Sequence, residues 1–121
     1  MPELLLIESR LSPCGWVKTT FSQHGCKVTR VLHVKQAERA LRQCKFDVVL
    51  IASEGVLPCM TDVRRLREST TLPLLVLMPS ATETNQTDLI QAGVDTLICD
   101  NIAREALWPE VEHLLNRKCL Q

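Results

Sequence analysis

Four short segments of the chain are apolar at nearly every position. They are Leu4–Ile7, Val48–Ile51, Leu74–Leu77 and Thr96–Cys99. Because these runs do not alternate between apolar and polar residues, they are typical of strands that helices cover on both faces, as in a parallel sheet. A fifth segment, Val28–Leu32, is more mixed and indicates a strand at the edge of the sheet.

Helical patterns lie between the apolar runs. Ser12 can cap a helix that has Pro13 in its first turn and ends near Gly25. Apolar residues at helical spacing predict four more helices, with the stripes Ala37, Ala40, Leu41 and Cys44; Val63 and Leu66; Leu89 and Ile90; and Leu107, Val111, Leu114 and Leu115. Alternating strands and helices, joined by right-handed crossovers, predict an α/β fold with a doubly wound parallel sheet.

The length and composition favour one folded domain. The chain has 121 residues, of which 45% are apolar and 23% charged, and its 14 basic and 14 acidic residues give no net charge. This balance argues against a nucleic-acid-binding surface or a polybasic membrane patch. No apolar run approaches the about 20 residues that span a bilayer, and Met1 precedes no basic leader. We therefore expect a cytoplasmic domain over residues 1–121, with 116–121 resembling the start of a linker to an output domain.

The cysteines do not indicate a metal site. They stand at positions 14, 26, 44, 59, 99 and 119, whereas a structural zinc site usually includes at least one close pair of ligands. A glycine-rich dinucleotide motif is also absent. The sequence thus predicts free thiols and no metal or other cofactor.

In a doubly wound sheet the functional cleft lies at the carboxyl ends of the strands. The residues that follow the predicted strands there are Glu8 and Ser9; Ala52, Ser53 and Glu54; Met78; and Asp100. The segments "LLLIES", "FDVVLIAS", "LPLLVLMPS" and "AGVDTLICDN", with the closing "AREALWPEVEHLLNRK", resemble the receiver (CheY-like) domain of two-component response regulators over nearly the whole chain. The resemblance implies a flavodoxin-like five-stranded sheet of order 2-1-3-4-5. It places the first and last helices on one face and the other three on the opposite face.

The same resemblance implies a phosphorylation site that this chain has largely lost. Carboxylates of a receiver hold magnesium and one of them accepts the phosphoryl group, while a hydroxyl and a lysine stabilise its oxygens. At the matching positions the acid pair is Glu8 and Ser9, the acceptor is Ala52, the hydroxyl is Met78 and the lysine is Asp100. Only Glu8 keeps the expected chemistry. We therefore predict a pseudo-receiver with no catalytic residues, which is not phosphorylated on aspartate.

We expect such a domain to act in two-component (phosphorelay) signalling by protein–protein interaction. Its partner would be a histidine kinase, an output domain or a second copy, with no nucleic acid or membrane involved. In the receiver family the fourth helix, fifth strand and fifth helix form dimers, and we expect Ile102, Leu107 and Trp108 to contribute to this surface. Pro109 should kink the last helix or delay its start.

Three alternatives remain open at this stage. Ser53 or Glu54 could replace the missing acceptor, or Glu8, Glu54 and Asp100 could bind an ion or small ligand as a sensor. Cys14, at the start of the first predicted helix, could carry phosphoryl chemistry, since a helix N-terminus lowers a thiol pKa. His24 is expected to pack inward as a half-buried imidazole.

Overall fold

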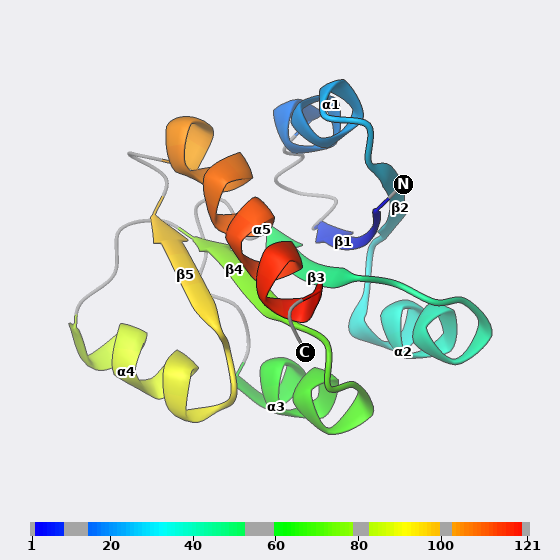
Figure 1. Cartoon of the computed structure of the whole chain (residues 1–121). Helices are drawn as coiled ribbons and strands as arrows, with labels where there is room; N and C mark the ends of the chain where they lie inside the picture. Colours follow the sequence, from blue (N-terminus) through cyan, green and yellow to red (C-terminus); the bar gives the residue numbers. More distant parts are fainter. Residues whose placement is uncertain (1, 9–14, 53–59, 79–82, 100–102, 120–121) are drawn as a thin grey trace.

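The computed structural model describes residues 2–8, 15–52, 60–78, 83–99 and 103–119. Strands and helices alternate along the chain (Figure 1): β1 (Glu3–Glu8), α1 (Gly15–Gln23), β2 (Lys27–Val31), α2 (Val34–Gln43), β3 (Val48–Ala52), α3 (Met60–Ser69), β4 (Leu74–Met78), α4 (Glu83–Gln91), β5 (Thr96–Cys99) and α5 (Ala103–Cys119). The strands form a parallel sheet of order β2-β1-β3-β4-β5. The predicted fold class and strand order are confirmed.

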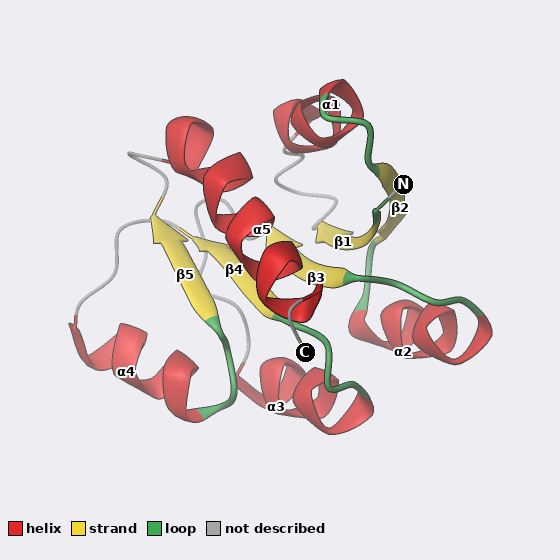
Figure 2. Cartoon of the chain, in the orientation of Figure 1, coloured by secondary structure: helices red, strands yellow, loops and turns green. Residues whose placement is uncertain are grey.

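Helices cover both faces of this sheet (Figure 2), which is why the central strands are apolar at consecutive positions. Alternate strand residues enter two separate hydrophobic clusters. Leu6 and Leu50 belong to the cluster that contains residues of α1 and α5. Ile7 and Ile51 belong to the other, with residues of α2, α3 and α4. Every side chain of a central strand therefore has a defined face.

Polar contacts close the amino-terminal edge of the sheet. The Arg67 guanidinium, at the end of α3, donates to the carbonyl oxygens of Thr70 (2.7 Å), Leu72 (2.7 Å) and Gly93 (3.0 Å) and to Oδ2 of Asp95 (3.1 Å). Gly93 has a φ of 112°, and a Cβ added there would lie 2.4 Å from Cγ and Cδ of Arg67. Only a glycine lets the arginine side chain pass at this point.

Polar contacts also hold the first residues of β1 and β4. The Glu3 amide donates to Oδ2 of Asp47 at 2.8 Å, and the Asp47 amide donates to the Glu3 carbonyl at 2.7 Å. The Leu74 amide donates to Oδ2 of Asp95 at 2.7 Å. Aspartates just before β3 and β5 therefore hold the first residues of β1 and β4.

The last helix begins at Ala103 and includes Pro109. Of the two alternatives predicted for Pro109, the late start is therefore wrong, and the kink stays a prediction. Leu107, Val111 and Leu114 of α5 are buried against the sheet. None of the described helices is long and apolar enough to cross a membrane.

Candidate functional site

The structure brings two of the predicted site residues together at the carboxyl edge of the sheet. Glu8 and Ala52 end the neighbouring strands β1 and β3 and are partners in the register of this strand pair. Each residue is only 2% exposed. Met78 ends β4, where its backbone pairs with Cys99. A buried carboxylate therefore lies beside a methyl group at the position of the expected phosphoacceptor.

Arg30 neutralises the Glu8 carboxylate. Its Nη2 lies 3.3 Å from Oε1 of Glu8, and the two side chains are 42% and 3% exposed. Arg30 pairs with Leu6 in the register of β1 and β2, two positions before Glu8, so Arg30 and Glu8 lie on the same face of the sheet. Because a buried charge is costly without a partner, this guanidinium is what permits a carboxylate at the end of β1.

The described residues of the site do not fit a magnesium ion. A magnesium site needs oxygen ligands, usually from one or two carboxylates, and Glu8 is the acid that the described strand ends provide. Its oxygen is already paired with a guanidinium. Within the described ranges no group of three His, Cys, Asp or Glu residues could hold a metal ion. The Ala52 methyl cannot accept a phosphoryl group.

Several predicted site residues lie outside the described part of the chain. They are Ser9, Cys14, Ser53, Glu54, Asp100 and Ile102. Their expected roles as an acceptor, an ion site, a nucleophile and a contact residue stay predictions.

The predicted interaction surface on α5 needs correction. Leu107 is completely buried, so its assignment to a contact surface is wrong. Trp108 is half-buried and faces α1, where its ring stacks on His24 at 4.2 Å between centroids and 4° between planes. It also meets Phe21 edge-on at 6.3 Å. Trp108 therefore packs on its own domain, and His24 is exposed rather than turned inward.

Sequence reasoning missed two residues near functional surfaces. Arg30 was counted only as part of an edge strand, whereas the register of β1 and β2 places it on the face of Glu8. Ile90, assigned to a buried stripe, is 49% exposed, while Leu89 is buried. Ile90 borders a shallow hollow on α4 and β5 with Gln86, Thr87, Gln91 and Leu97.

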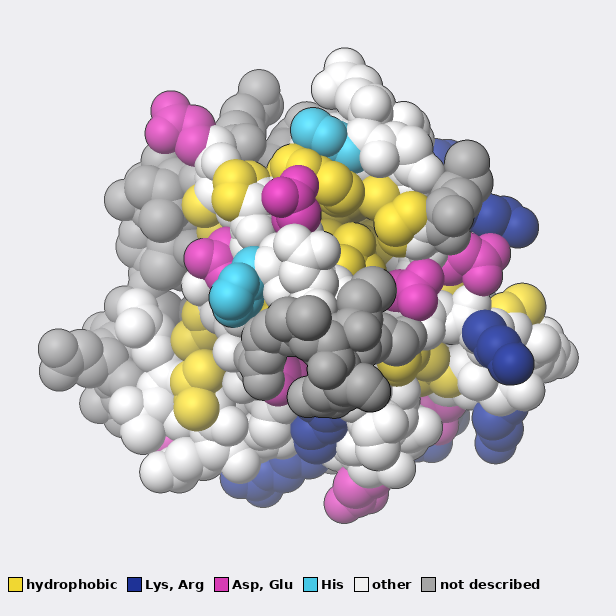
Figure 3. All heavy atoms as spheres, in the orientation of Figure 1, with side chains coloured by type: hydrophobic (Ala, Val, Ile, Leu, Met, Phe, Trp, Pro, Cys, Tyr) yellow, Lys and Arg dark blue, Asp and Glu magenta, His cyan; other side chains and the backbone are white. Residues whose placement is uncertain are grey.

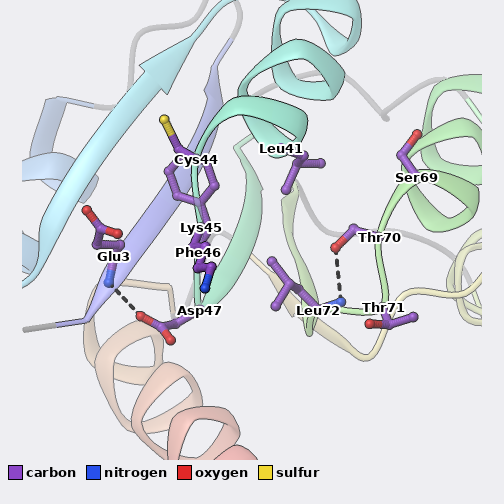
Figure 4. Close-up of a pocket in the computed structure, with 10 residues that line it drawn as sticks. All are labelled: Glu3, Leu41, Cys44, Lys45, Phe46, Asp47, Ser69, Thr70, Thr71 and Leu72. Atoms are coloured by element: carbon purple, nitrogen blue, oxygen red, sulfur yellow. Dashed lines mark hydrogen bonds between the residues drawn. The ribbon is translucent and has the colours of Figure 1, made fainter.

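A second hollow, of about 480 Å³, lies at the opposite edge of the sheet (Figure 4). It lies near the carboxyl ends of α2 and α3, where its lining includes Leu41, Cys44, Phe46 and Leu72. Two of the polar side chains that border it have partners within the domain, since Asp47 accepts from the Glu3 amide and Oγ1 of Thr70 accepts from the Leu72 amide. These contacts indicate a structural role for this edge.

Comparison with known proteins gives the class of the fold. No protein-family model matches the chain. The chain is 22% identical over 118 residues to an uncharacterized transcriptional regulatory protein of Bacillus subtilis, YclJ, an alignment that covers 95% of this chain and 51% of that protein. The chain thus spans about half the length of this relative.

The solved structures that resemble the chain are receiver domains. That of Francisella response regulator 1452 matches with a TM-score of 0.82 and 20% identity, over 98% of this chain and 99% of that one. The Klebsiella pneumoniae RstA domain, solved in a BeF3-activated form, has a TM-score of 0.80 and 20% identity over 93% and 97% of the two chains. The Pseudomonas aeruginosa PA1611 domain, which coordinates magnesium in its active-site cleft, has values of 0.78 and 21% over 95% and 98%. The chain has the receiver-domain fold.

Proposed function

We propose that the chain is a receiver-like signalling domain that works through protein contacts and takes no phosphoryl group on an aspartate. The observation that carries this proposal is the arrangement at the ends of β1 and β3. Ala52, at the end of the central strand, offers a methyl group, and the neighbouring Glu8 carboxylate is paired with Arg30. An acyl phosphate requires a carboxylate nucleophile, which Ala52 lacks.

Two proteins of the same fold show the contrasting behaviour. The PA1611 receiver domain coordinates magnesium, and the RstA receiver domain is activated by beryllofluoride. In this chain, the guanidinium of Arg30 supplies the positive charge beside Glu8. This internal cation supports a site that needs no added ion, since the charge of the Glu8 carboxylate is already balanced.

The partner would be a histidine kinase, an output domain or a second copy. The relative YclJ is about twice as long as this chain, which is consistent with an output domain outside the receiver-like part. The surface of α4 and β5 supports a contact site, because Ile90 is exposed there beside Leu97. A homodimer through α4, β5 and α5 would bury these side chains in place of the predicted Leu107.

An amide NMR titration with magnesium and beryllofluoride tests the loss of phosphorylation. We expect no saturable shifts at Glu8, Arg30 and Ala52, while the RstA receiver domain under the same conditions serves as the positive control. Saturable shifts at the carboxyl ends of β1 and β3 would contradict the proposal. Repeating the titration with Ser53→Ala and Glu54→Gln would then identify the replacement acceptor.

A further inference from the structure

Three exposed basic residues form a stripe along α2. Lys35, Arg39 and Arg42 follow the spacing i, i+4 and i+7, which places them on one face of the helix. Glu38, the acid of this helix, borders the stripe but forms an ion pair with Arg65 of α3. Because Arg65 already balances the charge of Glu38, the α2 stripe keeps a positive charge.

The exposed face of α5 carries the opposite charge at the same spacing. Glu105, Pro109 and Glu112 are exposed and also follow i, i+4 and i+7, while Leu107 and Val111 are buried on the inner side. No Lys or Arg occurs among the α5 side chains that the structure describes. In Figure 3 acidic side chains appear along α5 on the facing surface, whereas most visible Lys and Arg side chains lie toward the margins.

The two stripes match in length. Lys35 and Arg42 are separated by two helical turns, as are Glu105 and Glu112, and both pairs thus span about 10.5 Å along the helix axis. Within one molecule the stripes cannot meet, because α2 packs on one face of the sheet and α5 on the other. Two copies can bring them together.

We propose that the α2 stripe of one copy docks against the α5 stripe of a second copy. The contact is heterologous, so a pair of copies keeps one free stripe of each sign and can bind a further copy at either end. Since the net charge is zero, no general repulsion opposes the approach, and the opposite fields of the two stripes steer it. Exposed charge pairs are individually weak and are screened by salt, which makes this association weak and salt-dependent.

This inference rests on the proposed interaction function and names its partner as a second copy. The docking of copies and the loss of phosphorylation can be contradicted independently of each other. The beryllofluoride titration concerns the ends of β1 and β3, whereas the docking of copies concerns α2 and α5.

Charge reversal tests the contact. One variant carries Lys35→Glu, Arg39→Glu and Arg42→Glu, and the other carries Glu105→Lys and Glu112→Lys. In sedimentation velocity at about 20 mM salt, we expect the wild type to associate, with a dissociation constant at least about tenfold weaker at about 300 mM salt. Each variant alone should remain monomeric, because its two stripes then have the same sign. A mixture of the two variants should associate again.

Matched controls separate stripe pairing from a general change in charge. Lys18→Glu and Glu68→Lys alter exposed residues outside the stripes and should leave association unchanged. If a multiple variant fails to fold by circular dichroism, the single changes Arg39→Glu and Glu112→Lys replace it, because these positions avoid the first turn of either helix. A monomeric wild type at low salt would overturn the proposal. So would association that survives reversal, or a mixture of variants that stays monomeric.

Discussion

The two edges of the sheet are built in different ways. At the amino-terminal edge, the Arg67 guanidinium donates to carbonyl groups on both sides of β4 and to Asp95, and Asp47 holds the start of β1. At the carboxyl edge, the described residues provide a single ion pair, Glu8 with Arg30, beside the methyl group of Ala52. Among the described residues, the extensive polar bonding thus lies at the edge opposite the candidate site.

This difference indicates that stability and function depend on opposite edges of the sheet. We therefore expect side chains at the carboxyl edge to change with little effect on folding. The proposed loss of the acceptor at Ala52 is consistent with this expectation, since Ala52 belongs to the hydrophobic cluster on that face of the sheet.

The largest effect is expected at Arg67. Replacing it with alanine removes the donors of three carbonyl groups and the partner of Asp95. Because partly buried acceptors then lose their partners, Arg67→Ala should lower the free energy of unfolding by about 3–5 kcal/mol. Urea unfolding followed by circular dichroism measures the change.

Arg64→Ala is the matched control, because Arg64 is exposed on the same helix. It should change the free energy of unfolding by less than about 0.5 kcal/mol. Equal losses of unfolding free energy for Arg67→Ala and Arg64→Ala would contradict the stabilising role of the Arg67 contacts at the amino-terminal edge.

The next largest effect is expected at Gly93. A methyl group there meets the Arg67 side chain at 2.4 Å, and the φ of 112° is unfavourable for any residue with a Cβ. Gly93→Ala should therefore destabilise the fold by about 2–3 kcal/mol in the same urea experiment.

Gly25 distinguishes the cost of a positive φ from the cost of a contact with the Arg67 side chain. Its φ is 77°, but a Cβ would meet nothing within 4 Å. Gly25→Ala should cost only about 1 kcal/mol. In an Arg67→Ala background the cost of Gly93→Ala should fall toward that value, which a double-mutant cycle measures. Additive effects would show that the arginine does not enforce this glycine.

The apolar runs were sufficient to predict the sheet and its buried central strands. Strands covered on both faces require consecutive apolar residues, which is a local signal. The edge strand was also predictable, since the polar residues Thr29 and Arg30 interrupt its apolar run. Gly25 and Gly93 marked the ends of α1 and α4, because both have the positive φ that helix ends favour.

The contacts of individual side chains were not readable in the same way. The pairing of Arg30 with Glu8 depends on the register of β1 and β2, which no local pattern encodes. Trp108 was placed toward α4 because Pro109 suggested an irregular helix, whereas in the structure its ring contacts His24 and Phe21. Arg67 gave no signal because its acceptors are mostly backbone carbonyls, which no residue type marks in a sequence.

At the carboxyl edge we expect smaller effects on stability, which differ in sign between two substitutions. Arg30→Ala leaves the buried Glu8 carboxylate without its partner and should cost about 1–2 kcal/mol. Glu8→Leu removes the buried charge and adds apolar surface to a buried position, so stability should be unchanged or higher. Thermal unfolding compares the two variants. A large loss for Glu8→Leu would show that the carboxyl edge also stabilises the fold.

The smallest effect concerns thiol reactivity and leaves stability aside. Burial raises the pKa of the Cys26 thiol above its ordinary value, whereas Cys44 is exposed beside the hollow at the amino-terminal edge. A raised pKa leaves less thiolate at a given pH, so Cys26 should react with iodoacetamide at least about tenfold more slowly than Cys44 near pH 8 and should need a higher pH. Peptide mass spectrometry after timed alkylation reports each cysteine separately, and equal rates would contradict the burial of Cys26.

The same peptide mass spectra report the alkylation of Cys14, which follows β1 in the sequence. Alkylation of Cys14 well below neutral pH would favour a reactive thiol at the carboxyl edge and weaken the view that this edge has lost its phosphoryl chemistry.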